Sequence, residues 1–168
     1  LFLFVGTMMI PFQVRMIPVF NVLRTIGWLN SYRGLILPRA AGAFGIFLFV
    51  QFFRALPMEM EDAAAIDGCS TFRIYWNIIL PLSTAAIATY GVTSFTGNWN
   101  DLMYPLIIVT KREMMTLPVA LALFRGSYVS SAPTVMAGAT LAMAPVVVLF
   151  LMAQRYFVES LALTGLKG

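Results

Sequence analysis

Few side chains in this sequence are suited to acid–base, nucleophilic or metal chemistry. Histidine is absent from the 168 residues, which removes the commonest general base and metal ligand. Cys69 is the single cysteine, so no internal disulfide can form. The chain also has no phosphate-binding loop of the GxxxxGK[ST] type. We therefore predict no catalytic residue, no metal site and no cofactor bound by this chain.

The carboxylates are distributed unevenly along the chain. Four of the seven lie between Pro57 and Gly68, a stretch without Lys or Arg, whereas Asp101 stands alone in an apolar region. A membrane-embedded hydrolase would need paired acids, or a nucleophile with its base, at the same depth. One isolated carboxylate argues against that class of enzyme.

The composition is that of an integral membrane protein. Hydrophobic residues make up 60% of the chain and charged residues 11%, with a mean hydropathy of +0.86. Soluble domains carry about 25% charged residues. The net charge of +4 comes without a basic cluster interleaved with aromatic residues, so we expect no nucleic-acid partner.

Four segments are apolar enough to span a bilayer, which takes roughly 20 residues of helix. They are residues 1–21, 34–53, 82–109 and 134–158. We predict an all-α, polytopic transmembrane bundle forming one domain over residues 1–168. Because the chain begins with Leu1 inside an apolar run, we expect a C-terminal fragment whose first spans are missing and whose first segment is truncated.

Two pairs of small residues at four-residue spacing lie in the predicted spans. Ala41 with Gly45, and Gly138 with Ala142, would let neighbouring helices approach closely. The alternative is that Gly and Ala are simply frequent in membrane helices. Arg39 lies near the end of its segment, where its side chain can reach the interface.

The segment from Pro57 to Pro81 reads as a polar helical hairpin. Pro57 suits the first turn of a helix, and Gly68 suits the left-handed residue that ends one. Ser70 or Thr71 can cap a second helix, which Pro81 then ends or kinks.

The first arm of this hairpin has an alanine-rich side that would fit a groove on another protein. The alternative is an amphipathic helix resting on the bilayer, but such helices are usually basic and this one carries only acids.

The spacing within the hairpin resembles the EAA loop of bacterial ABC importer permeases. The matching positions are Asp62, Ala63, Ala64, Gly68, Ile78, Leu80 and Pro81. Asp62 stands where that family usually has Glu. Further segments resemble the carbohydrate-uptake group of the maltose-transporter type: "PFQVRMIPVFNVLRTIGWLNSYRGLILP", "FGIFLFVQFF", "WNDLMYPLIIV", "TLPVALALF" and "MAGATLAMAPVVVLFLMAQRYFVESLALTGLKG".

This resemblance implies a permease subunit of the bacterial or archaeal cytoplasmic membrane. It implies that residues 57–81 form a cytoplasmic coupling hairpin docked on a separate ATPase dimer, which binds ATP and Mg²⁺. The other implied partners are a second permease subunit, a periplasmic or lipid-anchored sugar-binding protein, and membrane lipid. Residues 111–133, with Lys111, Arg112 and Arg125, would meet the binding protein, and Thr164–Gly168 would reach toward the ATPases.

Asn98, Asn100 and Asp101 are candidates for the translocation path, since amides and carboxylates suit hydroxyl-rich sugars. The alternative for Asp101 is a helix cap at the outer interface.

The alternative function is an ion-coupled transporter or a channel, for which broken helices in symmetric halves would be expected. The charge bias also opposes the family topology. Four Lys or Arg would lie inside and seven outside, the reverse of the positive-inside tendency.

Overall fold

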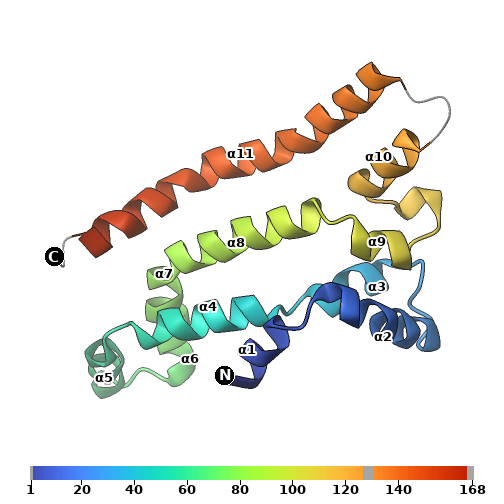
Figure 1. Cartoon of the computed structure of the whole chain (residues 1–168). Coiled ribbons are helices and arrows are strands. Elements are labelled where there is room, and N and C mark those ends of the chain that lie inside the picture. The colour runs from blue at the N-terminus through green and yellow to red at the C-terminus, as the bar shows by residue number, and fades with distance from the viewer. Residues whose placement is uncertain (1, 127–130, 166–168) are drawn as a thin grey trace.

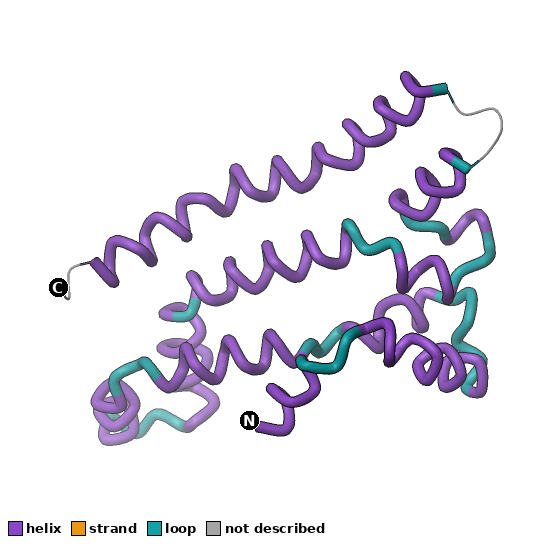
Figure 2. The backbone as a smooth tube through the Cα atoms, viewed as in Figure 1, coloured by secondary structure: helices purple, strands orange, loops and turns teal. Residues whose placement is uncertain are grey.

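The computed structural model describes residues 2–126 and 131–165, with side chains described for residues 3–126 and 131–154. Every regular element in these ranges is helical, as Figure 2 shows. The predicted all-α class is confirmed. Three long helices, α4, α8 and α11, run side by side, and shorter helices gather at their two ends (Figure 1).

The first apolar segment is not one helix. Helix α1 (Phe2–Met8) stops before Pro11, and α2 (Phe12–Thr25) starts after it. Pro11 has an extended ψ of 145° and occupies the N-cap of α2. Residues 1–21, which Pro11, Arg15 and Pro18 interrupt, are not among the candidate membrane spans of the described residues, and the helix breaks at Pro11, where proline suits a helix start.

The second segment folds as predicted for residues 34–53. It comprises α3 (Tyr32–Ile36), the 3₁₀ turn η1 (Leu37–Arg39) and α4 (Ala43–Arg54). Residues Tyr32–Arg54 are long and apolar enough to cross a membrane. Side chains of α4 pack against α1 and α8.

The hairpin follows as two arms. The first arm is α5 (Met58–Ile66), and the second runs through α6 (Thr71–Ile74), the π-helical η2 (Tyr75–Ile79) and α7 (Leu80–Leu82). The chain then bends by 71° into α8 (Thr84–Trp99).

The third predicted span, residues 82–109, is wrong at its carboxyl end. Helix α8 stops at Trp99, and a separate helix, α9 (Met103–Ile108), follows after a short break. The second arm and α8 together are apolar enough to form one bent span. The described residues thus hold two candidate spans, or three with this bent pair, where the sequence predicted about four.

The last part of the chain comprises the 3₁₀ turn η3 (Arg112–Met114), α10 (Leu117–Arg125) and α11 (Ala132–Gly165). Residues Ala132–Gln154 of α11 form the second clear candidate span, close to the predicted residues 134–158. Helix α11 packs against α8 and α10, and several of its described apolar side chains, such as Leu141 and Met152, are exposed.

The small-residue positions mark two of the helix contacts. A side chain at Gly45 would collide with the ring of Tyr90 on α8, and one at Gly138 would collide with Leu121 on α10. Ala142 accepts a hydrogen bond through its carbonyl from Trp99 Nε1 at 2.9 Å. The predicted close approaches at Gly45 and Gly138 are confirmed.

A compact apolar core lies at the end of the long helices away from the hairpin. Its buried residues, which come from α2 and the α9 region, are Leu23, Tyr104, Ile108 and Val109. Partly buried apolar side chains pack around them. Figure 1 shows α2, α3, α9 and α10 gathered there, while α5, α6 and the carboxyl end of α11 lie at the opposite end. The chain therefore has two structurally distinct ends.

Candidate functional site

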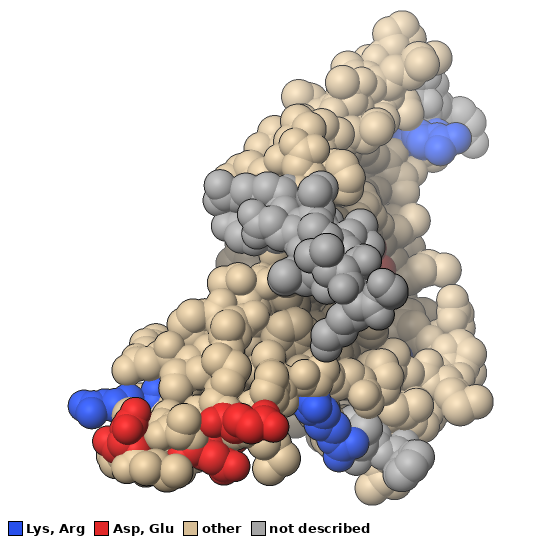
Figure 3. Space-filling view, turned by 90° about the vertical axis from the view of Figure 1, so that its left-hand side faces the viewer, with Lys and Arg blue, Asp and Glu red and all other residues tan. Residues whose placement is uncertain are grey.

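The first arm of the hairpin begins directly after Pro57. Pro57 has φ −63° and ψ 128° and occupies the N-cap of α5, one position before the expected first turn. Glu59 and Glu61 follow in the first turn, where negative charge complements the helix dipole. The acids of this arm form an exposed cluster at one corner of the molecule (Figure 3).

The corner of the hairpin is a Schellman motif centred on Gly68. Gly68 has φ +80°, its N–H bonds to the carbonyl of Ala65 at 3.0 Å, and the Cys69 N–H bonds to the carbonyl of Ala64 at 2.9 Å. A side chain at Gly68 would meet no atom within 4 Å. The requirement for glycine is thus one of backbone conformation rather than space.

The second arm starts with a side-chain cap. Ser70 Oγ accepts a hydrogen bond from the N–H of Arg73 at 3.4 Å, so Ser70 rather than Thr71 is the cap. Phe72 and Trp76 stack on the exposed side of this arm, with ring centroids 6.2 Å apart and planes 15° apart.

A widened turn accommodates the proline of the second arm. The N–H of Leu80 bonds to the carbonyl of Tyr75, five residues back, which defines the π-helical turn of η2. Pro81 follows at once and cannot donate a bond to residue 77. Because the π-helical turn precedes Pro81, the helix continues past this proline to Leu82 before the chain bends.

The bend after Pro81 is organised by Ser83, which the sequence did not single out. Ser83 is fully buried, and its Oγ donates to the carbonyl of Ile79 at 2.6 Å. Its N–H donates to the same carbonyl at 3.0 Å and to that of Leu80 at 3.1 Å. The three residues predicted to anchor the hairpin, Ile78, Leu80 and Pro81, are less buried than Ser83 and Ile79. Ile78 and Leu80 are half-buried and Pro81 is exposed, whereas Ile79 is buried.

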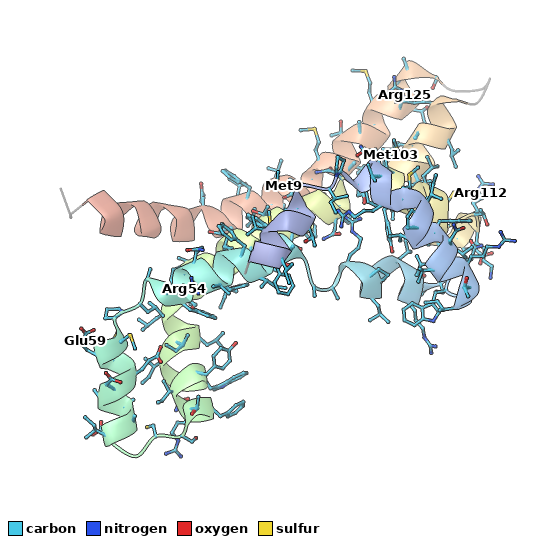
Figure 4. All side chains as sticks on the ribbon, turned by 60° about the horizontal axis from the view of Figure 1, so that its bottom comes forward. Met9, Arg54, Glu59, Met103, Arg112 and Arg125 are labelled. Atoms are coloured by element: carbon cyan, nitrogen blue, oxygen red, sulfur yellow. The ribbon has the colours of Figure 1, made fainter. Side chains whose placement is uncertain are left out.

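The predicted groove-fitting face divides between the two sides of α5. Asp62 and Ala63 are exposed, whereas Ala64 is buried on the side that packs against α6. Ile66 is 86% exposed at the tip. Figure 4 shows the hairpin standing clear of the long helices, with Glu59 on its outer arm and Arg54 where α4 leads into it. The exposed surface of the hairpin combines the acids of the first arm with apolar side chains, among them the stacked rings of Phe72 and Trp76 on the second arm.

Asp101 lies in the break between α8 and α9. Its Oδ1 accepts hydrogen bonds from the N–H groups of Met103 at 3.0 Å and Tyr104 at 3.4 Å, and its Oδ2 pairs with the guanidinium of Arg39. This is the helix-cap geometry of the alternative that the sequence left open. Both carboxylate oxygens are engaged.

The two candidate amides lie beside Asp101 but do not converge on it. Asn98 is exposed, and its Nδ2 donates to the carbonyl of Ser94 at 2.7 Å on the same helix. Asn100 is exposed at the end of α8. Among the described residues, Asn98 Oδ1 and the Asn100 side chain have no hydrogen-bond partner.

Asn30 connects the loop after α2 to the chain after α9 at the opposite end of the molecule, a role that we did not predict from the sequence. Its φ is +54°, and its N–H donates to the carbonyl of Ile108 at 3.1 Å. Its Oδ1 accepts from the N–H and Oγ1 of Thr110 at 2.7 and 3.0 Å and from the N–H of Lys111 at 3.0 Å. The available signal was an Asn after the Gly27 turn, which favours the left-handed region.

The predicted outer connection is described for residues 111–126 and 131–133. Lys111 and Arg112 are exposed. Figure 4 places Arg112 and Arg125 at the end away from Glu59 and Arg54. The side chains of the predicted tail, Thr164–Gly168, lie outside the described residues.

Three comparisons with known proteins agree with one another. A family profile described as "Binding-protein-dependent transport system inner membrane component" matches residues 1–162. The arabinooligosaccharides transport system permease protein AraQ of Halalkalibacterium halodurans is 35% identical over 161 residues, covering 96% of this chain and 58% of that protein.

Two further proteins show the same similarity. The sn-glycerol-3-phosphate transport system permease protein UgpE of Yersinia enterocolitica is 41% identical over 159 residues, covering 92% of this chain and 56% of that protein. A crystal structure of a bacterial ABC transporter involved in the import of the acidic polysaccharide alginate aligns with a TM-score of 0.81 and 25% identity. That alignment covers 93% of this chain and 60% of the solved chain.

The chain spans a little under three fifths of the length of the curated relatives it matches. The comparisons do not favour an ion-coupled transporter or a channel. With a family match over almost its whole length, the chain belongs to the inner-membrane components of binding-protein-dependent transport systems.

Proposed function

We propose that this chain is part of the permease subunit of an ATP-driven importer of carbohydrates or related hydroxyl-rich solutes. Support comes from the relatives, whose names refer to arabinooligosaccharides, sn-glycerol-3-phosphate and alginate. These solutes share many hydroxyl groups. The subunit itself catalyses no chemical reaction and binds no cofactor.

The hairpin couples this subunit to a separate dimer of ABC ATPases, which binds ATP and Mg²⁺. The observation that carries the proposal is its geometry. A capped hairpin stands clear of the long helices, turns at a glycine with positive φ and exposes acids along its first arm. The coupling positions are Asp62, Ala63, Ala64, Gly68, Ile78, Leu80 and Pro81, to which we add Ser83.

The subunit crosses the cytoplasmic membrane of a bacterium or archaeon several times, surrounded by lipid and paired with a second permease subunit. The hairpin lies on the cytosolic side. The end that carries Asn30, Lys111 and Arg112 meets a periplasmic or lipid-anchored sugar-binding protein. The count of four Lys or Arg inside and seven outside still opposes this orientation.

Within the translocation path, Asn98 and Asn100 are the residues we expect to meet the solute. Both are exposed, and amide groups can donate to and accept from sugar hydroxyls. Asp101 is less suited to this role because its oxygens already accept from Met103, Tyr104 and Arg39.

Crosslinking tests the coupling role directly. In the full-length permease with Cys69→Ser, a cysteine at Ile66, which is 86% exposed, receives a photoactivatable label in the assembled transporter. The matched control places the cysteine at Met103, exposed on α9. We expect the ATPase to be captured from position 66 and not from 103. A transporter that still moves solute but never yields the ATPase from position 66 would contradict the proposal.

Vesicle uptake separates this function from the ion-coupled alternative. We expect solute entry to require ATP on the hairpin side and to persist when ion gradients are collapsed by ionophores. Uptake that follows an ion gradient without ATP would support the alternative instead.

A further inference from the structure

Three side chains form a polar joint where two broken helices meet at the outer end of the molecule. Arg39 belongs to η1, just before α4, Asp101 lies in the break between α8 and α9, and Tyr104 belongs to the first turn of α9. Arg39 and Asp101 are 62 residues apart in the sequence and form an ion pair with side chains 34% and 18% exposed. We call Arg39, Asp101 and Tyr104 the outer joint.

Asp101 uses its two oxygens for two different purposes. Oδ1 caps the first turn of α9 through the N–H groups of Met103 and Tyr104, at 3.0 and 3.4 Å. Oδ2 pairs with Arg39. A single carboxylate therefore fixes both where α9 starts and how it lies relative to η1.

Tyr104 closes the joint from the other side. The guanidinium carbon of Arg39 lies 5.1 Å from the centroid of the Tyr104 ring, a cation–π arrangement. The hydroxyl of Tyr104 donates to the carbonyl of Gly34 on α3 at 2.6 Å, and its ring meets Phe12 of α2 edge-on at 5.9 Å. The ring itself is buried.

The joint therefore connects α2, α3 and η1 to α9. An exposed ion pair alone stabilises little. Here the Arg39 guanidinium contacts a carboxylate and a ring, and three further hydrogen bonds fix the positions of these two groups. The orientation of the Arg39 side chain is therefore restricted. The bend at Ser83 lies at the other end of α8.

We propose that Arg39 is a positioning residue for transport, which acts by holding Asp101 and thereby keeping the outer ends of α4 and α8 together. With these ends joined, a displacement of the hairpin moves α4 and α8 as one unit. Without Arg39, the ends of α4 and α8 that lie away from the hairpin move independently, and hydrolysed ATP moves less solute. This inference rests on the proposed function, because it assumes that the hairpin receives the displacement.

The test measures solute moved per ATP hydrolysed by the full-length permease in its assembled transporter in proteoliposomes. This ratio does not change when a variant merely lowers the amount of folded protein. Asp101→Asn keeps an oxygen for the N–H groups of α9 but removes the charge that pairs with Arg39. Arg39→Gln removes the same pair from the other side.

We expect each of these variants to lower the ratio about fivefold, as expected for loss of an ion pair at the strong end of the exposed range. The double variant should fall no further, because both changes remove one interaction. Arg39→Lys keeps the charge and should restore about half of the ratio. The control, Arg33→Gln, removes an exposed arginine of α3 nearby and should leave the ratio unchanged.

A second measurement reports on the joint independently of transport. Spin labels on exposed Leu37 of η1 and exposed Leu106 of α9 give a distance distribution in the same transporter. We expect a narrow distribution that broadens in Asp101→Asn and in Arg39→Gln but not in Arg33→Gln.

An unchanged ratio in both joint variants, or an unchanged distance distribution, would overturn the inference. Failure of the proposed function would look different, because the unsubstituted protein would then show no ATP-driven uptake while the distance distributions still reported the joint.

Discussion

Gly45 on α4 lies directly against the ring of Tyr90 on α8. A β-carbon built at Gly45 would lie 2.5 Å from Cε2 of Tyr90, well inside van der Waals contact. Phe49, one turn further along α4, meets the same ring edge-on with centroids 5.6 Å apart. This contact sets how closely two of the long helices approach.

Gly45→Val should therefore separate α4 from α8. Overpacking of this kind costs about 1–3 kcal/mol, so we expect a lower midpoint of thermal unfolding in nanodiscs. Gly91→Val on α8 is the control, because a side chain there meets no atom within 4 Å. Combining Gly45→Val with Tyr90→Ala should recover part of the loss, and a double variant less stable than both single variants would contradict this account.

Substitutions at Gly68 should act through backbone conformation alone. The site has φ +80° and open space around it, so a side chain is strained without any clash. Gly68→Val should insert normally into the membrane but uncouple uptake from ATP hydrolysis, because a β-branched residue resists positive φ. Gly68→Asn should retain most of the coupling, since Asn tolerates this region. Equal uptake by Gly68→Val and the unsubstituted protein would show that the turn is not needed.

Three substitutions of Asn30 separate the effect of its backbone conformation on stability from the effect of its side-chain hydrogen bonds. Asn30→Asp keeps the acceptor oxygen and the tolerance of positive φ, so its stability should change by less than about 0.5 kcal/mol. Asn30→Gly keeps only the conformation and should lose about 0.5–1.5 kcal/mol, because the exposed N–H groups of Thr110 and Lys111 exchange their acceptor for water.

Asn30→Ala loses both properties and should be the least stable of the three. The midpoints of thermal unfolding should fall in the order Asp, Gly, Ala. A midpoint for Ala above that for Gly would show that the positive φ of Asn30 costs nothing.

Ser83 should tolerate loss of its hydroxyl better than enlargement. Ser83→Ala removes one hydrogen bond, but the carbonyl of Ile79 keeps the N–H of residue 83, so we expect a loss of about 1 kcal/mol. Ser83→Leu forces a larger side chain into a fully buried position and should abolish coupling at normal expression.

The control for Ser83 is Thr93→Val. Thr93 makes the same kind of bond, from Oγ1 to the carbonyl of Thr89 at 2.8 Å, but it is exposed. Its loss should leave uptake and thermal stability unchanged. Normal uptake by Ser83→Leu would show that the bend does not need the compact residue.

The hairpin could be predicted from sequence because its signals are local. Pro57, Gly68 and Ser70 each favour one backbone conformation or one cap, whatever surrounds them. Gly45 and Gly138 were recognisable for a related reason, since a missing side chain is needed where helices touch.

The outer joint and the Asn30 contacts could not be predicted because their partners are remote. Arg39 and Asp101 are 62 residues apart, and Asn30 and Thr110 are 80 apart. No short-range pattern distinguishes Arg39 from an arginine that reaches the lipid headgroups. Asp101 looked like an isolated acid for the same reason.

The helix breaks were missed because hydropathy does not register them. Residues 82–109 are predominantly apolar and carry one charged residue, Asp101, yet the chain turns at Ser83 and again after Trp99. The turn at Ser83 follows a π-helical turn, whose hydrogen bonding depends on Pro81 and on the packing of Ile79 together. Apolar length predicts that a segment can cross a membrane, not that it is straight.

The bend at Ser83 has a geometric consequence for the direction of movement. Because the buried Ser83 lies at the 71° bend, we expect the second arm and α8 to move as one rigid, bent unit. Under the proposed function, a displacement of the second arm along the membrane surface therefore tilts α8 relative to the membrane. Under that function, the bend sets the direction in which α8 moves, while the outer joint keeps α4 with it.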